Sequence, residues 1–164
     1  MTIDYVNQTR DTVFILISFL APIIIYFGLP VLLQRFADKK QVSRWPLAVG
    51  GVLFFIAWYL PAPLIEGKNT AFFTHVIGGG IFSGFLWLYI KNHLKLKFNI
   101  WLDLLCLYIL VSTLGATNEL FELLANRLHL TTITGFDTWW DLLANTLGAV
   151  IFWLVWKASQ KYWS

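Results

Sequence analysis

The stretch that decides the fold is VFILISFLAPIIIYFGLPVLL, residues 13–33, which carries no charged side chain. At a rise of about 1.5 Å per residue, a helix of this length spans the roughly 30 Å hydrocarbon core of a bilayer. The residues before it include Asp4, Arg10 and Asp11 rather than a basic segment, and no small-residue cleavage site follows the run. We therefore expect a retained membrane-spanning helix and not a signal peptide.

The composition of the whole chain agrees with a membrane protein. Of its 164 residues, 58% are hydrophobic and 13% are charged, and the mean hydropathy is +0.66. An average soluble domain has about 45–50% apolar and about 25% charged residues. The formal net charge is +3, but the basic residues separate apolar runs instead of forming one surface, so we expect no nucleic-acid partner. The single cysteine, Cys106, excludes an intramolecular disulfide and a cysteine-based metal site.

The apolar runs predict an all-α, polytopic membrane bundle of about five transmembrane helices. Trp45-Pro46 suits the first turn of the second helix, because proline lacks a donor that this turn does not need, and Pro61 ends it. The Gly78-Gly79-Gly80 run with Gly84 predicts close packing between helices. We treat residues 1–164 as one membrane domain with spans at 13–33, 45–60, 72–90, 100–124 and 137–156.

The basic residues predict how the chain is oriented. Nine of the twelve fall on one side of the predicted spans: Arg35, Lys39, Lys40, Arg44, Lys91, Lys95, Lys97, Lys157 and Lys161. Three fall on the other: Arg10, Lys68 and Arg127. Because lysine and arginine are enriched in cytoplasmic loops, the N-terminus is expected outside and the C-terminus in the cytoplasm. Asp103, on the cytoplasmic side, is explained by helix capping or by pairing with Lys95 or Lys97.

Acidic and polar residues gather at the opposite, outward side. Counting the rise along each predicted helix places His75, Glu119 and Asp141 about 5 to 8 Å below the outer boundary. Asp137, at the first residue of the last span, could simply cap that helix. His75 on the third span could simply be a hydrogen-bonded histidine inside the bundle. The candidate ligand or proton site is therefore His75, Glu119, Glu122, Asp137, Asp141 and Asn145.

A carboxylate at this depth is costly in hydrocarbon. It therefore indicates either a functional site or a polar contact that joins two helices. Oxygen ligands suit a divalent cation such as Mg²⁺, Ca²⁺ or Mn²⁺. The candidate metal ligands are Glu119, Glu122, Asp137 and Asp141, with His75 as an acid or base.

Two stretches resemble a known family. NELFELLANRLHLTTITGFDTWWDLLANTLGAVIF, residues 118–152, is similar to the carboxy-terminal half of VanZ-like membrane proteins and of YjdF-like bacterial inner-membrane proteins. FFTHVIGGGIFSGFLWLYI, residues 72–90, resembles the earlier helix of that family, which carries a histidine near its start and glycines after it. VanZ-like proteins usually place an arginine shortly before the aspartate of the last helix, whereas Arg127 lies ten residues before Asp137, which favours the YjdF-like side. The resemblance, over residues 70–155, implies a multi-pass protein of the inner membrane with a cell-envelope role, which for the founding VanZ-like member is low-level glycopeptide resistance.

Three function classes remain open. The first is binding of an envelope lipid or an antibiotic-related polar ligand at the outward acidic site. The second is a metal-dependent enzyme that acts on a lipid-linked phosphate at the outer face. The third is a structural membrane subunit whose polar groups hold helices together. Membrane lipids are the expected partners, and transport through the chain would require an oligomer because it shows no inverted repeat.

Overall fold

The helices of the chain follow the apolar runs of its sequence. The computed structural model describes residues 2–36, 42–61, 63–65, 68–69, 71–131 and 138–163. Its helices are α1 (Thr2–Leu33), α2 (Trp45–Ala57), α3 (Phe72–Thr74), the π-helix η1 (His75–Ile81), α4 (Phe82–Leu94), α5 (Ile100–Arg127) and α6 (Thr138–Trp163). A short antiparallel hairpin, β1 (Leu64–Ile65) and β2 (Lys68–Asn69), lies between α2 and α3. The prediction of an all-α membrane bundle is confirmed, apart from this hairpin.

Within the part of the chain that the structure describes, four helical segments are long and apolar enough to cross a membrane: Phe14–Leu33, Phe72–Leu94, Ile100–Arg127 and Thr138–Gln160. The second predicted span, at 45–60, is shorter than expected. Its helix α2 ends at Ala57, and its 13 residues extend only about 20 Å. The chain leaves the α-helix before Pro61: Tyr59 and Leu60 donate to the carbonyls of Ile56 and Ala57, three residues back, which are turn bonds. Pro61 then disfavours helical geometry in Leu60 and keeps the helix from resuming. Pro46 lies in the first turn of α2, as predicted.

The other helix bounds differ from the prediction by a few residues, except at the start of the chain. α1 begins at Thr2 and so continues the first span through the charged residues before Val13. The third span continues to Leu94 and the fourth to Arg127. α6 begins at Thr138, so Asp137, the predicted first residue of this span, lies outside the described residues.

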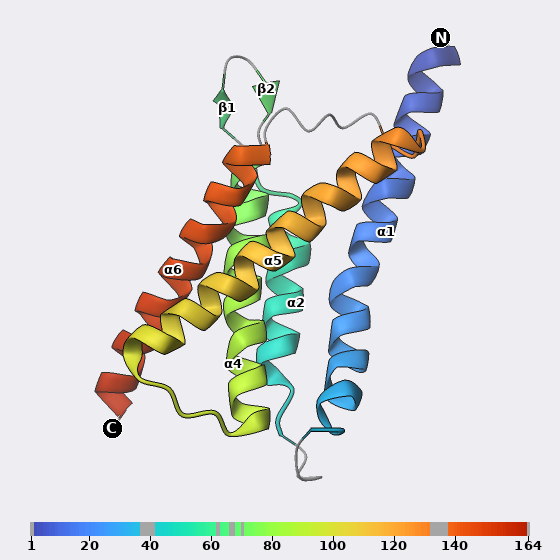
Figure 1. The fold of residues 1–164 in the computed structure, drawn as a ribbon. Helices are drawn as coiled ribbons and strands as arrows, with labels where there is room; N and C mark the ends of the chain where they lie inside the picture. The colour runs from blue at the N-terminus through green and yellow to red at the C-terminus, as the bar shows by residue number, and fades with distance from the viewer. Residues whose placement is uncertain are drawn as a thin grey trace.

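Figure 1 shows α1 beginning and α6 ending at opposite ends of the bundle. α5 runs obliquely across it, from the end of α6 to the beginning of α1. At one extreme of α5, Asp103 pairs with Lys157 of α6, and at the other the rings of Phe121 and Phe14 stack 5.6 Å apart. We call the end where α6 begins the α6-start end, and the opposite one the α6-finish end.

Glycines allow η1 and α4 to lie directly against α6. A Cβ at Gly80 would overlap backbone atoms of Asn145 and Gly148, and a Cβ at Gly148 would overlap the carbonyl of Val76. A Cβ at Gly84 would overlap the ring of Phe152. Close helix contact through small residues is typical of membrane bundles, and the packing predicted for this glycine run is confirmed.

A buried ion-pair network fixes the α6-finish end. Asp103 is 1% exposed, and its carboxylate lies 2.6 Å from Lys91 Nζ and 2.9 Å from Lys157 Nζ. Trp87 Nε1 donates a third hydrogen bond to Oδ1 over 2.9 Å. The pairing of Asp103 predicted with Lys95 or Lys97 is therefore wrong. Lys91 lies on α4 one turn before that helix ends, so it reaches the buried carboxylate, whereas Lys95 is the exposed residue that caps α4.

Candidate functional site

Three of the predicted residues meet where η1, α5 and α6 approach one another. One ligand atom from each of His75, Glu119 and Asp141 lies within 4.8 Å of the other two. His75 Nε2 lies 3.4 Å from Asp141 Oδ1, and the two side chains are 14% and 3% exposed. We call these three residues the His75 cluster. It joins an imidazole and two carboxylates from three separate segments at the α6-start end.

The π-helix places His75 against α6. η1 begins at His75, directly after the three residues of α3. A π-helical turn contains one residue more than an α-helical turn, and such turns occur often at functional sites. Gly80, five residues or little more than one turn further along, allows η1 to reach the α6 backbone at Asn145 and Gly148. This close contact brings the histidine at the start of η1 to the level of Asp141, one turn into α6.

Asn145 lies one turn beyond Asp141 and extends the His75 cluster inward. Asn145 is 4% exposed, its side chain interacts with the His75 ring, and its Oδ1 has no hydrogen-bond donor among the described residues. The amide occupies space left by two glycines: a Cβ at Gly79 would overlap Oδ1, and a Cβ at Gly115 would lie 3.1 Å from Nδ2. Gly115 is not among the residues predicted from the sequence. An isolated glycine within an apolar helix is the signal that points to it.

The remaining candidates do not join this group. Glu122 Oε1 accepts a hydrogen bond of 2.7 Å from Asn118 Nδ2, one turn earlier on α5. Glu122 follows Glu119 by three residues and so lies about 60° away on the same helical face, but among the described residues the ligand atoms that converge with His75 are those of Glu119 and Asp141. Asp137 lies outside the described residues. The structure thus gathers His75, Glu119, Asp141 and Asn145, and not Glu122.

The donor set of the His75 cluster suits a divalent cation. Two carboxylates held close together favour either a bound cation or a shared proton, because two negative charges at this distance repel each other. Mg²⁺ and Mn²⁺ take carboxylate oxygens, and Mg²⁺ is commonly held by one or two carboxylates together with phosphate oxygens of a ligand. Three protein ligands leave several coordination positions for such oxygens. His75, predicted as an acid or base, also offers a ring nitrogen to this group as a candidate ligand.

Several of the residues that carry the VanZ-like resemblance build this site. His75 and the glycines after it form η1, while Asp141, Asn145 and Gly148 lie on one face of α6 against it. Membership of that family stays a prediction that rests on these motifs. In comparisons with known proteins, no family model, curated protein or solved structure matches the chain.

Proposed function

We propose that this chain is a multi-pass membrane protein that binds a divalent cation at the His75 cluster and, through it, the phosphate of an envelope lipid. The observation that carries the proposal is the convergence of ligand atoms from His75, Glu119 and Asp141 within 4.8 Å. The second favourable feature is Asn145 Oδ1, a buried oxygen beside the cluster without a donor among the described residues.

The depth of the cluster suits a lipid headgroup. Asp141 is the fourth residue of α6, and His75 is the fourth residue of the helical segment that begins at Phe72. Both therefore lie about 5 Å from a helix start, where the hydrocarbon core gives way to the headgroup region. A cation held there can neutralise a lipid phosphate without leaving the membrane surface.

The direction of the bundle is part of the proposal. By their positions along the helices and connections, seven of the described basic residues belong to the α6-finish end, and three belong to the α6-start end: Arg10, Lys68 and Arg127. The seven at the α6-finish end are Arg35, Arg44, Lys91, Lys95, Lys97, Lys157 and Lys161. The positive-inside rule then assigns that end to the cytoplasm and the His75 cluster to the outer face. The resemblance to VanZ-like and YjdF-like proteins supports a cytoplasmic-membrane location and an envelope role.

We place binding ahead of catalysis for a chemical reason. A metal-dependent enzyme on a lipid-linked phosphate needs an acid or base in addition to its metal ligands. In this arrangement His75, the residue best suited to proton transfer, serves as a ligand. A purely structural role for the same groups is an outcome of the experiment below.

The experiment measures cation binding by the purified full-length chain in lipid nanodiscs. Mn²⁺ is the probe, because its free and bound forms differ in electron paramagnetic resonance. We expect one saturable site in the wild-type protein. Asp141→Asn and Glu119→Gln each remove a charged ligand, so the Mn²⁺ affinity should fall about tenfold or more, comparable with the losses seen when metal sites are perturbed. Nanodiscs that contain phosphatidic acid should strengthen Mn²⁺ binding relative to phosphatidylcholine alone.

The matched control is Glu122→Gln. It lies on the same helix as Glu119 and removes the same charge, but outside the His75 cluster, and should leave Mn²⁺ affinity unchanged. An equal loss in Glu122→Gln would show general surface attraction instead of a site. Absence of saturable binding in the wild-type protein would reject the cation site and leave the structural role.

A further inference from the structure

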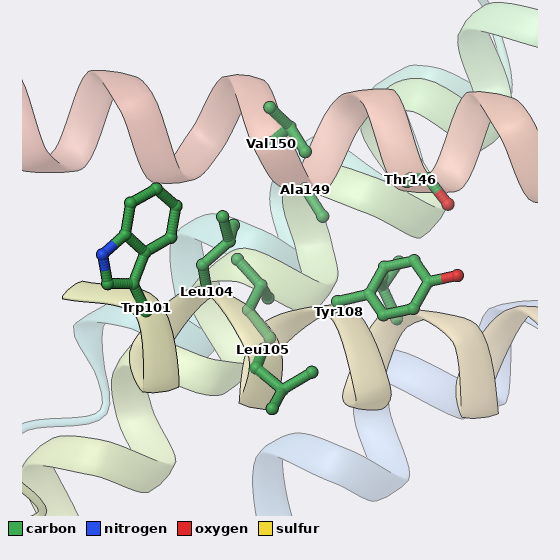
Figure 2. Close-up of a pocket in the computed structure, with 9 residues that line it drawn as sticks. Trp101, Leu104, Leu105, Tyr108, Thr146, Ala149 and Val150 are labelled. Carbon is green, nitrogen blue, oxygen red and sulfur yellow. The ribbon is translucent and has the colours of Figure 1, made fainter. Parts of the chain in front are cut away.

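A groove with a volume of about 310 Å³ lies between α5 and α6 (Figure 2). Its floor consists of Leu107, Val111 and Ala149, each at most 2% exposed. Ala149 is the smallest residue of this floor, and its short side chain leaves space between the two helices. The volume is within the range of about 300–1,000 Å³ that is common for small-molecule sites.

The surface of this groove suits hydrocarbon. Its rim is formed by large apolar or aromatic side chains that remain open to the surroundings, including Trp101 at 76%, Leu105 at 51% and Tyr108 at 53% exposure. The one aliphatic hydroxyl in the lining, on Thr146, donates to the backbone carbonyl of Leu142 over 2.8 Å. A polar ligand would therefore find few partners in the groove, whereas an alkyl chain would bury apolar surface.

The two carboxylates of the His75 cluster, Glu119 and Asp141, lie on the two helices that form the groove. In Figure 2 the hydroxyls of Tyr108 and Thr146 mark one end of the groove. Continuing in that direction, α6 runs back from Thr146 to Asp141, five residues or about 8 Å away, and α5 runs on from Val111 to Glu119, eight residues or about 12 Å away. The polar cluster and the apolar groove are thus arranged in the order of a lipid headgroup and its chain.

We propose that the groove between α5 and α6 binds one hydrocarbon chain of the lipid whose phosphate is held at the His75 cluster. The inference rests on the proposed function, because the headgroup site fixes where the chain begins. It adds that the ligand is a phospholipid-like amphiphile rather than a free phosphate. Chain length should then contribute to affinity through the apolar area buried in the groove.

The test measures retention of phosphatidic acid by the full-length chain in detergent, using native mass spectrometry with Mn²⁺ present. Long-chain dipalmitoyl phosphatidic acid should be retained at least about tenfold better than short-chain dihexanoyl phosphatidic acid, which corresponds to about 1.4 kcal/mol. Val150→Trp fills the groove from its rim, where Val150 is 37% exposed. This variant should reduce the chain-length preference to about one while leaving Mn²⁺ affinity unchanged.

Val155→Trp is the matched control, since Val155 is 65% exposed on the same helix but does not line the groove. It should retain the wild-type preference. An unchanged preference in Val150→Trp, with Mn²⁺ binding intact, would overturn the groove proposal and leave the cation site standing. Loss of Mn²⁺ binding in the wild-type chain would instead overturn the proposed function. A dimer in the wild type that becomes monomeric in Val150→Trp would assign the groove to a second copy and also reject the lipid-chain proposal.

Discussion

The bundle has a polar cluster around a buried aspartate at each end, and the two clusters are built differently. At the α6-finish end, Asp103 lies between two lysines and accepts a third hydrogen bond from Trp87. At the α6-start end, Asp141 and Glu119 lie with a histidine. Both clusters join the α5 and α6 helices to the segment that runs from Phe72 to Leu94.

The difference lies in the sign of the surrounding charge. One aspartate between two ammonium groups forms a compact network with hydrogen-bond distances of 2.6–2.9 Å, which is the arrangement of a helix-joining contact. Two carboxylates beside an imidazole form an arrangement that a cation would complete. We infer that the first cluster stabilises the bundle, while the second is available for a ligand at some cost in stability.

The largest expected effect concerns which end faces outward. In a background with Cys106→Ser, Asn69→Cys reports the α6-start end and Asn92→Cys reports the α6-finish end. A membrane-impermeant maleimide added to intact cells should label the first and should label the second only after permeabilisation, because the basic residues favour the cytoplasm. The reverse labelling pattern would place the His75 cluster on the cytoplasmic side and reject an outer-leaflet ligand.

The second prediction compares one aspartate from each cluster. Asp103→Asn should lower the free energy of unfolding by about 3–5 kcal/mol, because it leaves two lysines without their buried counter-charge. Asp141→Asn should change it far less, since it removes one of two like charges. Equilibrium unfolding in mixed detergent and SDS micelles measures both.

Trp87→Phe shows how much one hydrogen bond of the Asp103 network contributes to the free energy of unfolding, for comparison with the loss of the whole charge in Asp103→Asn. It keeps both ion pairs and removes one hydrogen bond, so we expect a loss of about 0.5–1.5 kcal/mol. Equal destabilisation by Asp103→Asn and Asp141→Asn would contradict the division between a structural and a ligand-binding cluster.

The sequence predicts the fold better than it predicts which polar groups meet. Apolar run lengths identify the helices, because hydrocarbon thickness and the rise of a helix are fixed quantities. Equal depth groups His75, Glu119 and Asp141, whose ligand atoms lie close together in the structure. The three-residue spacing places Glu122 on the same helical face as Glu119, but it does not reveal that Glu122 bonds with Asn118. The partners of Asp103 depend on Lys157, a residue 54 positions away whose proximity only the folded bundle provides. The π-helix at 75–81, which lies against α6, is likewise not revealed by the periodicity of the sequence.

The smallest effect expected separates two glycines of that π-helix. A Cβ at Gly80 would lie 2.6 Å from Gly148 Cα and 2.8 Å from Ala149 N, so Gly80→Ala must push η1 away from the α6 backbone. A Cβ at Gly78 would lie 3.5 Å from Ala57 Cβ and from Phe54 Cδ2, which are ordinary contacts. Gly80→Ala should therefore lower the free energy of unfolding by about 1–3 kcal/mol, as substitutions at other overpacked sites do. It should also weaken Mn²⁺ binding, because His75 moves with η1.

Gly78→Ala is the control, and its free energy of unfolding should stay within about 1 kcal/mol of the wild type, since alanine also favours helical geometry. Unfolding and Mn²⁺ titration of the two variants measure both effects, and a Gly80→Ala variant with wild-type stability and affinity would show that the close contact of η1 with α6 does not position the site.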